Sequence, residues 1–215
     1  METDWDAEYK KLERLWNAPA DSALGIYNEL IPKGKVLDLG GGEGRNAIFF
    51  AGKGYDVTLV DKAETAVKRC ELTAKEKGLK IRTKQEDILA TAIEPSQYSL
   101  IIFSNVLSFF NEAAIKRLIE KAKSGLKLGG LIYIQCFSTD DPSYMRYKEK
   151  QKGHKGRTFI LNGGEYRHYF TKAEVLQRLS DFKSISIAEK SFLDIGHGKP
   201  HYHGVIEYLG VKESE

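Results

Sequence analysis

The stretch VLDLGGGEGRN, residues 36–46, packs four glycines into five positions directly after an aliphatic run that itself contains an acid. Asp38 lies inside an aliphatic run, and Gly40, Gly42 and Gly44 follow it at alternate positions. A glycine-rich turn between a strand and a helix offers bare backbone N–H groups to a ligand. A carboxylate at such a turn gains nothing from a pyrophosphate, but it complements a ligand that carries an ammonium and a sulfonium. The motif therefore predicts a site for a cationic cofactor that contains an amino acid.

Two further acids follow later β-type runs. Asp61 ends the run DVTLVD, about twenty residues after the glycine turn, where an acceptor for ribose hydroxyls is expected. Asp87 and Ile88 in QEDIL can hold an adenine amino group and cover its ring. Each acid alone can also be interpreted as a helix N-cap or a surface loop residue. Three acids at three successive strand ends, together with the glycine turn, favour the cofactor site.

These residues need an alternation of strands and helices to bring them to one edge of a parallel sheet. β-rich runs and helix-patterned runs do alternate here, which is typical of βαβ units. We expect one weaker helix over residues 84–98, between the third and fourth predicted strands, and an amphipathic N-terminal helix over residues 4–16. The predicted strands are 35–39, 56–60, 80–83, 99–104 and 130–137, and the predicted helices between them are 44–54, 63–78 and 111–125.

The C-terminal third shows a different pattern. Thr171 and Glu174 have capping-box spacing and predict a final helix over 171–182. Two β-type runs, 182–192 and 201–211, have no helix between them and are expected to pair as an antiparallel hairpin.

Composition indicates an ordinary globular domain. The chain has 215 residues, of which 41% are hydrophobic and 29% charged, and its formal net charge is +3. We expect one domain, no signal or transit peptide, no membrane span, no nucleic-acid partner and a cytoplasmic location. The basic stretch 148–157 is interpreted as a solvated loop, and the two cysteines have no metal-type CxxC spacing.

The segments VLDLGGGEGRN, LVDK, EDIL and LIIFSNVLSFF, in this order, resemble the class I S-adenosylmethionine-dependent methyltransferases over residues 35–137. The resemblance implies an α/β, Rossmann-like, doubly wound sheet of seven strands, six parallel and the last antiparallel. It also implies that the methionine end of the cofactor lies over the glycine turn and that Ser104 and Asn105 border the transferred methyl group. The cofactor-binding residues predicted in this way are Asp38, Gly40, Gly41, Gly42, Gly44, Arg45, Asn46, Asp61, Lys62, Asp87, Ile88, Ser104 and Asn105.

The methyl acceptor is less constrained by the sequence. The fourth strand lacks the NPPY-type tetrad of enzymes that methylate amide or exocyclic base nitrogens. GRN, GYDVTLVDK, VLSFF and YFTKAEVLQRL resemble the tellurite-resistance methyltransferase family and its neighbours, which implies a small-molecule acceptor such as a thiol or a chalcogen oxyanion. The alternatives are a protein that senses the cofactor without turnover and a nicotinamide-dependent oxidoreductase. A monomer or a homodimer is expected.

The resemblance also divides the chain. Residues 1–30 would form a helical lid that brings Trp5 or Trp16 over the cofactor, and 35–137 would form the cofactor-binding core. Residues 138–168 have the position of a variable insert that walls the acceptor pocket, although an exposed loop is an equal alternative. Residues 169–215 would form the last helix and the hairpin.

Three of the five histidines occur in DIGHGKPHYHG, near Asp194. The resemblance places this loop at the cofactor edge of the sheet, and alternation along a strand puts His201 and His203 on one side. They can be structural, hydrogen-bonding the hairpin; they can be catalytic, with His197 or His201 deprotonating or orienting a small nucleophile; or they can bind a metal with Asp194. We name His197 and His201 as the catalytic candidates and predict no metal.

Overall fold

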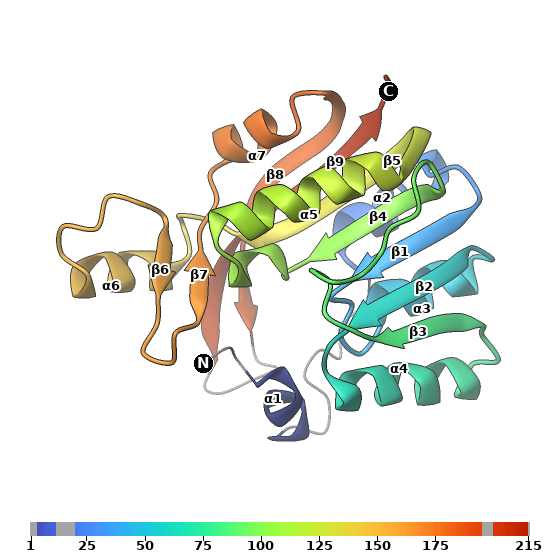
Figure 1. Ribbon diagram of the computed structural model, residues 1–215, viewed down its shortest axis with the longest axis horizontal. Coiled ribbons are helices and arrows are strands. Elements are labelled where there is room, and N and C mark those ends of the chain that lie inside the picture. The colour runs from blue at the N-terminus through green and yellow to red at the C-terminus, as the bar shows by residue number, and fades with distance from the viewer. Residues whose placement is uncertain (1–3, 12–19, 195–199, 215) are drawn as a thin grey trace.

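The computed structural model describes residues 4–11, 20–194 and 200–214. Its centre is a seven-stranded sheet with the strand order β3-β2-β1-β4-β5-β9-β8 (Figure 1). β9 pairs antiparallel with both β5 and β8, and the other pairings in this sheet are parallel. The strands are β1 Lys35–Leu39, β2 Asp56–Asp61, β3 Ile81–Gln85, β4 Tyr98–Ser104, β5 Leu126–Phe137, β8 Phe182–Asp194 and β9 His201–Lys212. The predicted fold class, with six parallel strands and the last one antiparallel, is confirmed.

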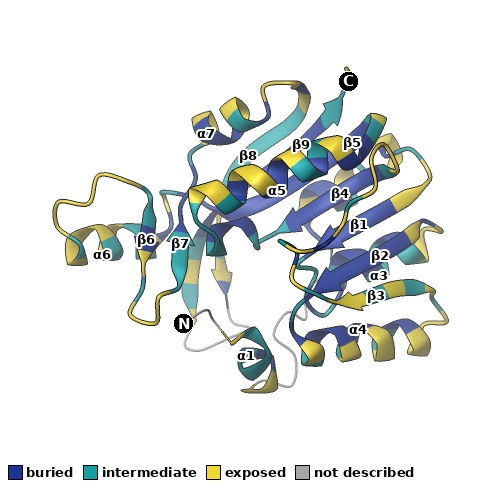
Figure 2. Cartoon of the chain, in the orientation of Figure 1, coloured by how far each residue is buried: buried dark blue, intermediate teal, exposed yellow. Residues whose placement is uncertain are grey.

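Helices cover both faces of the sheet. α5 (Glu112–Gly125) and α7 (Lys172–Arg178) pack on one face, and α2 (Ser22–Ile26), α3 (Arg45–Gly52) and α4 (Glu64–Glu76) pack on the other. The central strands are therefore buried on both faces, which explains their nearly continuous apolar sequences (Figure 2). β3 lies at the edge and alternates between half-buried and exposed residues.

The weaker helix predicted over 84–98 is wrong. The described chain forms only a short turn there, in which the carbonyl of Asp87 accepts the amides of Ala90 and Thr91. Pro95 has no amide to donate, and Ser96 adopts a positive φ of 53°, so the turn does not continue as a helix. The segment instead returns as an irregular loop to the start of β4.

Between β5 and α7 the chain forms a small projecting unit. It consists of α6 (Pro142–Lys150), β6 (Thr158–Ile160) and β7 (Tyr166–His168), and the last two strands form a separate antiparallel pair. Figure 1 shows this unit at the end of the molecule away from β3. The sequence predicts a variable insert here, and no sequence pattern indicated these three elements.

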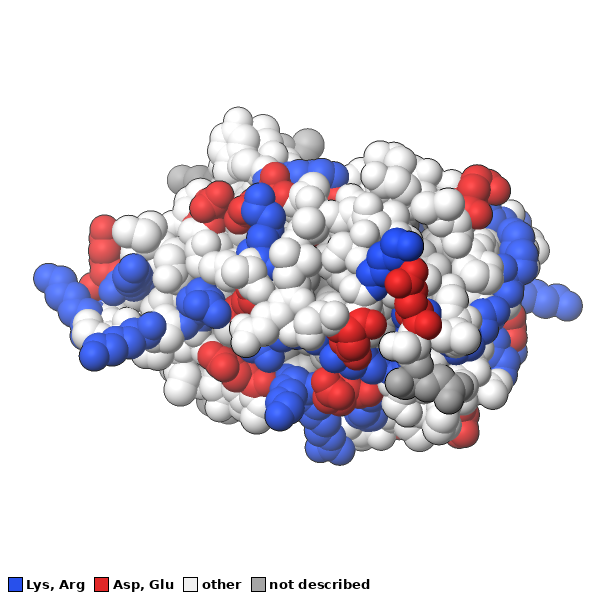
Figure 3. All heavy atoms as spheres, turned by 90° about the horizontal axis from the view of Figure 1, so that it is seen from above, with Lys and Arg blue, Asp and Glu red and all other residues white. Residues whose placement is uncertain are grey.

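The described N-terminal residues form α1 (Trp5–Lys11), which lies across the ends of the strands (Figure 1). No helix in the described ranges is long and apolar enough to cross a membrane. On the face seen in Figure 3, lysines and arginines are interspersed with acids rather than gathered in one tract.

Candidate functional site

A cavity of about 450 Å³ opens where β1, β2 and β4 end. Loops after three parallel strands meet at this edge, which is where open α/β sheets bind their ligands. Every residue predicted from the sequence to bind the cofactor lines this cavity. α1, the loop after β3, the turn after β4 and the turn between β6 and β7 complete its wall.

The glycine turn needs glycine for two reasons. Gly40, Gly42 and Gly44 have φ of +67°, +56° and +84°, a region that side chains disfavour. A Cβ on Gly40 would overlap Val106, and one on Gly44 would overlap the sulfur of Cys70. The turn is therefore packed against the chain's own atoms, while its open side forms part of the cavity wall.

Asp38 is the most perturbed acid of the site. Its side chain is 1% exposed, and neither carboxyl oxygen has a hydrogen-bond partner within the described chain. Burial raises the pKa of Asp38 to about 7, and repulsion by Asp21 adds to the rise. The positive charge of Arg45 opposes this rise. A buried carboxyl with this environment is completed by a ligand that donates hydrogen bonds and carries positive charge.

Asp61 is held in one orientation at the end of β2. One carboxyl oxygen accepts the amide of Gly42 at 2.8 Å and the other accepts the amide of Ala63 at 2.9 Å. Burial raises the pKa of Asp61, and these two hydrogen bonds oppose the rise. Each oxygen keeps acceptor capacity, so the carboxylate can take two hydroxyls of one ligand. Lys62, the next residue, also lines the cavity and favours the ionised form of Asp61.

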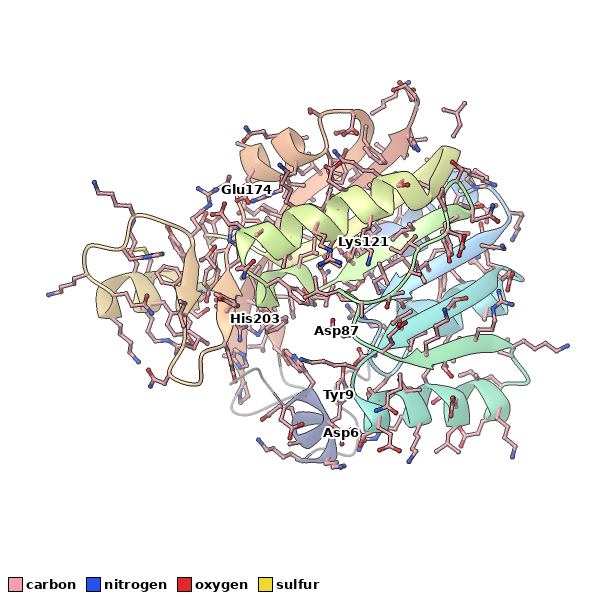
Figure 4. The ribbon with its side chains drawn as sticks, viewed as in Figure 1. Asp6, Tyr9, Asp87, Lys121, Glu174 and His203 are labelled. Atoms are coloured by element: carbon pink, nitrogen blue, oxygen red, sulfur yellow. The ribbon has the colours of Figure 1, made fainter. Side chains whose placement is uncertain are left out.

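Asp87 and Ile88 lie on the loop after β3. Asp87 is exposed and accepts the amide of Leu89 at 2.8 Å, whereas Ile88 is 4% exposed and joins the apolar core. Lys121 of α5 braces this loop by donating to the carbonyls of Leu89 and Thr91 at 3.2 and 2.5 Å. Figure 4 shows Asp87 and Lys121 on neighbouring elements.

Asn105 follows β4 in a strained conformation. Its φ is +55°, and its amide donates to the carbonyl of Gln135 at 2.8 Å. The side-chain oxygen is buried and has no hydrogen-bond partner among the residues described. A left-handed asparagine with an unsatisfied oxygen at a cavity wall is a mark of a functional position.

Arg45, Asn46 and Ser104 line the cavity, but their polar groups are engaged by Asp21. Arg45 forms an ion pair with Asp21 at 2.5 Å, and Ser104 donates to the same carboxylate at 2.6 Å. Asn46 exchanges hydrogen bonds with the amide and carboxylate of Asp21 at 3.0 and 2.9 Å. Asp21 was not predicted from the sequence, because no local pattern marks a residue whose partners, Arg45, Asn46 and Ser104, lie far along the chain. These contacts anchor the N-terminal segment beside the cavity.

α1 supplies two aromatic residues to the wall. Tyr9 is 6% exposed, and its hydroxyl lies where a Cβ on Gly42 would be. Trp5 contacts Phe109 edge to face, with ring centroids 4.5 Å apart. Figure 4 shows Tyr9 between α1 and the strand ends. Trp5 lines the cavity and Trp16 lies outside the described residues, so the covering of the cofactor by a tryptophan stays a prediction.

Among the described residues, no histidine lines the cavity. His203 donates through Nδ1 to the carboxylate of Asp141 at 2.8 Å and stacks on Phe137, whose ring lines the cavity. His201 lies next to it on β9, with the two Nε2 atoms 3.0 Å apart. His197 lies outside the described residues. The catalytic roles of His197 and His201 stay predictions.

The insert adds a buried cation near the cavity. Arg167 places its guanidinium carbon 4.4 Å from the ring centre of Phe109 and 5.3 Å from that of Phe137. Burial lowers the pKa of Arg167, and its Nε has no hydrogen-bond partner in the described part of the chain. Glu165 and Tyr166, its neighbours, line the cavity. Sequence reasoning named this segment but could not place Arg167 on these rings.

The strand order, the glycine turn and the acids at successive strand ends define a class I S-adenosylmethionine-dependent methyltransferase fold and site. The family described as Tellurite resistance protein TehB matches residues 17–187. Because this match covers more than half of the chain, the chain belongs to that family. The recognition made from the sequence is confirmed, and so are the enzyme class and the cofactor at the level of the family.

Relatives and solved structures agree with this assignment. The chain is 34% identical over 114 residues to the "Probable S-adenosyl-L-methionine-dependent methyltransferase TehB" of Haemophilus influenzae, an alignment that covers 53% of this chain and 40% of the relative. The chain thus spans less than half of that relative. The crystal structure of Haemophilus influenzae TehB has a TM-score of 0.72 at 23% identity and covers 96% of this chain and 66% of that one. The crystal structure of a Burkholderia thailandensis 1,6-didemethyltoxoflavin-N1-methyltransferase with bound S-adenosylhomocysteine has a TM-score of 0.73 at 20% identity. This match covers 98% of this chain and 86% of that one.

Proposed function

We propose that this chain binds S-adenosylmethionine in the cavity and transfers its methyl group to a small-molecule nucleophile. The observation that carries the proposal is the buried carboxyl of Asp38, which lines the cavity and has no hydrogen-bond partner in the described ranges. An ammonium group of a bound ligand supplies the donors and the positive charge that this carboxyl lacks. The relative with bound S-adenosylhomocysteine supports the same cofactor.

The remaining contacts follow from the donors and acceptors of the wall. Asp61 would accept the two ribose hydroxyls, because its carboxylate is already oriented by two backbone amides. Ile88 would cover the adenine ring, and Asp87 would accept its amino group. Ser104 and Asn105 would border the methyl group, and residues 1–30, through Trp5 of α1, would act as a lid.

The bound cofactor supplies an electrophilic methyl group on a sulfonium. Transfer to a nucleophile is an in-line displacement, so the chain chiefly has to align the acceptor and exclude water. The rings of Phe109 and Phe137 line the cavity and give it an apolar wall. Trp5 and Tyr9 of α1 also line the cavity, and the ring of Trp5 contacts that of Phe109.

We further propose an anionic acceptor, a thiolate or a chalcogen oxyanion. Arg167 supports this choice, because its nearly buried guanidinium lies against the two rings that wall the cavity and raises the local positive potential. The small, partly enclosed cavity supports a small molecule. The cytoplasmic location and the monomeric or homodimeric state remain predictions from the sequence.

Methyl transfer tests the proposal directly. The protein is incubated with methyl-labelled S-adenosylmethionine and, separately, tellurite, selenite, small thiols, amines and RNA. Labelled product with an oxyanion or a thiol is expected, and Asp38→Asn should abolish it while Asp140→Asn, the same change at an exposed acid, should not. Cofactor binding without product across the panel would favour the sensing alternative, and an absorbance change with a nicotinamide cofactor would favour the oxidoreductase.

A further inference from the structure

Two histidines and an acid converge at the cavity-side end of the C-terminal hairpin. His201 and His203 lie on the same side of β9, and Asp194 of β8 is the register partner of His201. One ligand atom from each of the three residues lies within 4.8 Å of the others. Figure 4 shows His203 at the end of the sheet that faces the insert.

We propose that His201, His203 and Asp194 bind a divalent transition-metal ion of the Zn²⁺ type. The proposal goes beyond the methyltransferase function and does not rest on it. Two imidazole nitrogens and a carboxylate oxygen are ligands that Zn²⁺ accepts, and three protein ligands leave a fourth coordination position.

The distances fit one ion. Ligand atoms about 2.0 to 2.1 Å from a tetrahedral Zn²⁺ lie roughly 3.3 Å from one another. Nε2 of His203 is 3.0 Å from Nε2 of His201 and 3.7 Å from a carboxyl oxygen of Asp194. These two separations are within a few tenths of an ångström of that value, and the ligand atoms of His201 and Asp194 lie within 4.8 Å of each other.

The orientation of His203 is fixed from its other nitrogen. Nδ1 is 2.8 Å from the carboxylate of Asp141, which also accepts the amide of Gly204 at 3.2 Å. The ring stacks on Phe137 with centroids 5.0 Å apart and an angle of 26°. A carboxylate on Nδ1 orients the ring so that Nε2 faces the proposed ion, as is usual behind metal-binding histidines.

Gly204 of β9 allows Asp141 to approach the strand closely. A Cβ on Gly204 would lie 2.5 Å from the amide nitrogen of Asp141, so only glycine lets the start of the insert reach β9 here. Asp141 also caps α6 by accepting the amide of Ser143 at 2.8 Å. The ion would join β8 to β9 at the end of the hairpin, and the His203–Asp141 hydrogen bond would link the site to the insert beside Phe137.

Co²⁺ is the probe, because its ligand-field absorption reports tetrahedral coordination. The full chain is freed of metal with a chelator, dialysed and titrated with Co²⁺, and the bound Co²⁺ is then displaced with Zn²⁺. Wild-type protein should show saturable tetrahedral bands at one ion per chain. His201→Gln changes a half-buried side chain and should lose the bands, whereas His154→Gln, an exposed histidine of the insert, should keep them.

Asp141→Asn tests the supporting contact, since asparagine preserves the cap of α6. It should weaken Co²⁺ affinity by about 10- to 100-fold. Circular dichroism of the metal-free variants checks that each is folded. A hydrogen-bonded histidine pair without metal function predicts no saturable bands in the wild type, and this result, or equal affinity in wild type and a folded His201→Gln, would overturn the proposal.

Discussion

The buried carboxyl of Asp38 makes the stability of the cofactor-free protein depend on pH. Folding raises the pKa of Asp38 from 3.8 to about 7, chiefly through burial and then through repulsion by Asp21. The contribution of an acid with a raised pKa is fully favourable below the unfolded value and is lost as the pH rises through the folded value. At about 1.4 kcal/mol for each pH unit between the two values, ionised Asp38 costs the folded state about 4 kcal/mol.

Asp38→Asn removes the charge and nearly preserves the shape. Between about pH 5 and about pH 8, the wild type should lose about 2.5 kcal/mol of unfolding free energy that the variant does not lose. Urea unfolding followed by circular dichroism, on protein freed of cofactor, measures this difference. Asp140→Asn, at an exposed acid, should follow the wild type. Equal pH dependence of Asp38→Asn and wild type would refute the burial of an ionisable carboxyl at this position.

Three other variants test the packing of the glycine turn, the buried ion pairs of Glu174 and the role proposed for Arg167. Gly44→Ala should destabilise the protein by about 1 to 3 kcal/mol more than Gly54→Ala in urea unfolding, because both have a positive φ but only the former would overlap Cys70. Burial raises the pKa of Glu174, but its hydrogen bonds and cationic neighbours lower it overall to about 2. Glu174→Gln should therefore cost about 2 to 3 kcal/mol near neutral pH and nothing near about pH 2, and equal unfolding curves near neutral pH would contradict this. Arg167→Met should lower kcat/KM for an anionic acceptor by about tenfold and leave S-adenosylhomocysteine affinity unchanged; a proportional loss of both would instead indicate a structural effect.

The sequence predicted the parts of the fold that repeat a local pattern. β1, the glycine turn and α3 carry their own signals, and so does the N-cap of α7, where Thr171 accepts the amide of Glu174 at 3.2 Å. The other half of that capping box is absent, because the Glu174 carboxylate binds Arg157, His168 and Arg178 instead. Tertiary partners of this kind leave no periodic trace in a sequence.

The residues of the candidate site likewise differ in whether they could be predicted from the sequence. Residues such as Asp38 and Asp61 could be predicted, because each follows from its place at the end of one strand. Asp21 could not be predicted, because its contacts with Arg45, Asn46 and Ser104 form only in the folded structure. The weaker helix predicted over 84–98 does not form, because Pro95 has no backbone amide to donate and the chain makes only a turn at Asp87.

Calorimetric titration of S-adenosylhomocysteine into the wild-type chain tests the central claim most directly. We expect saturable binding at one site per chain. Asp38→Asn should strongly weaken the affinity, and Asp140→Asn should retain it. Absence of binding to the folded wild-type chain, or equal affinity in Asp38→Asn, would contradict it.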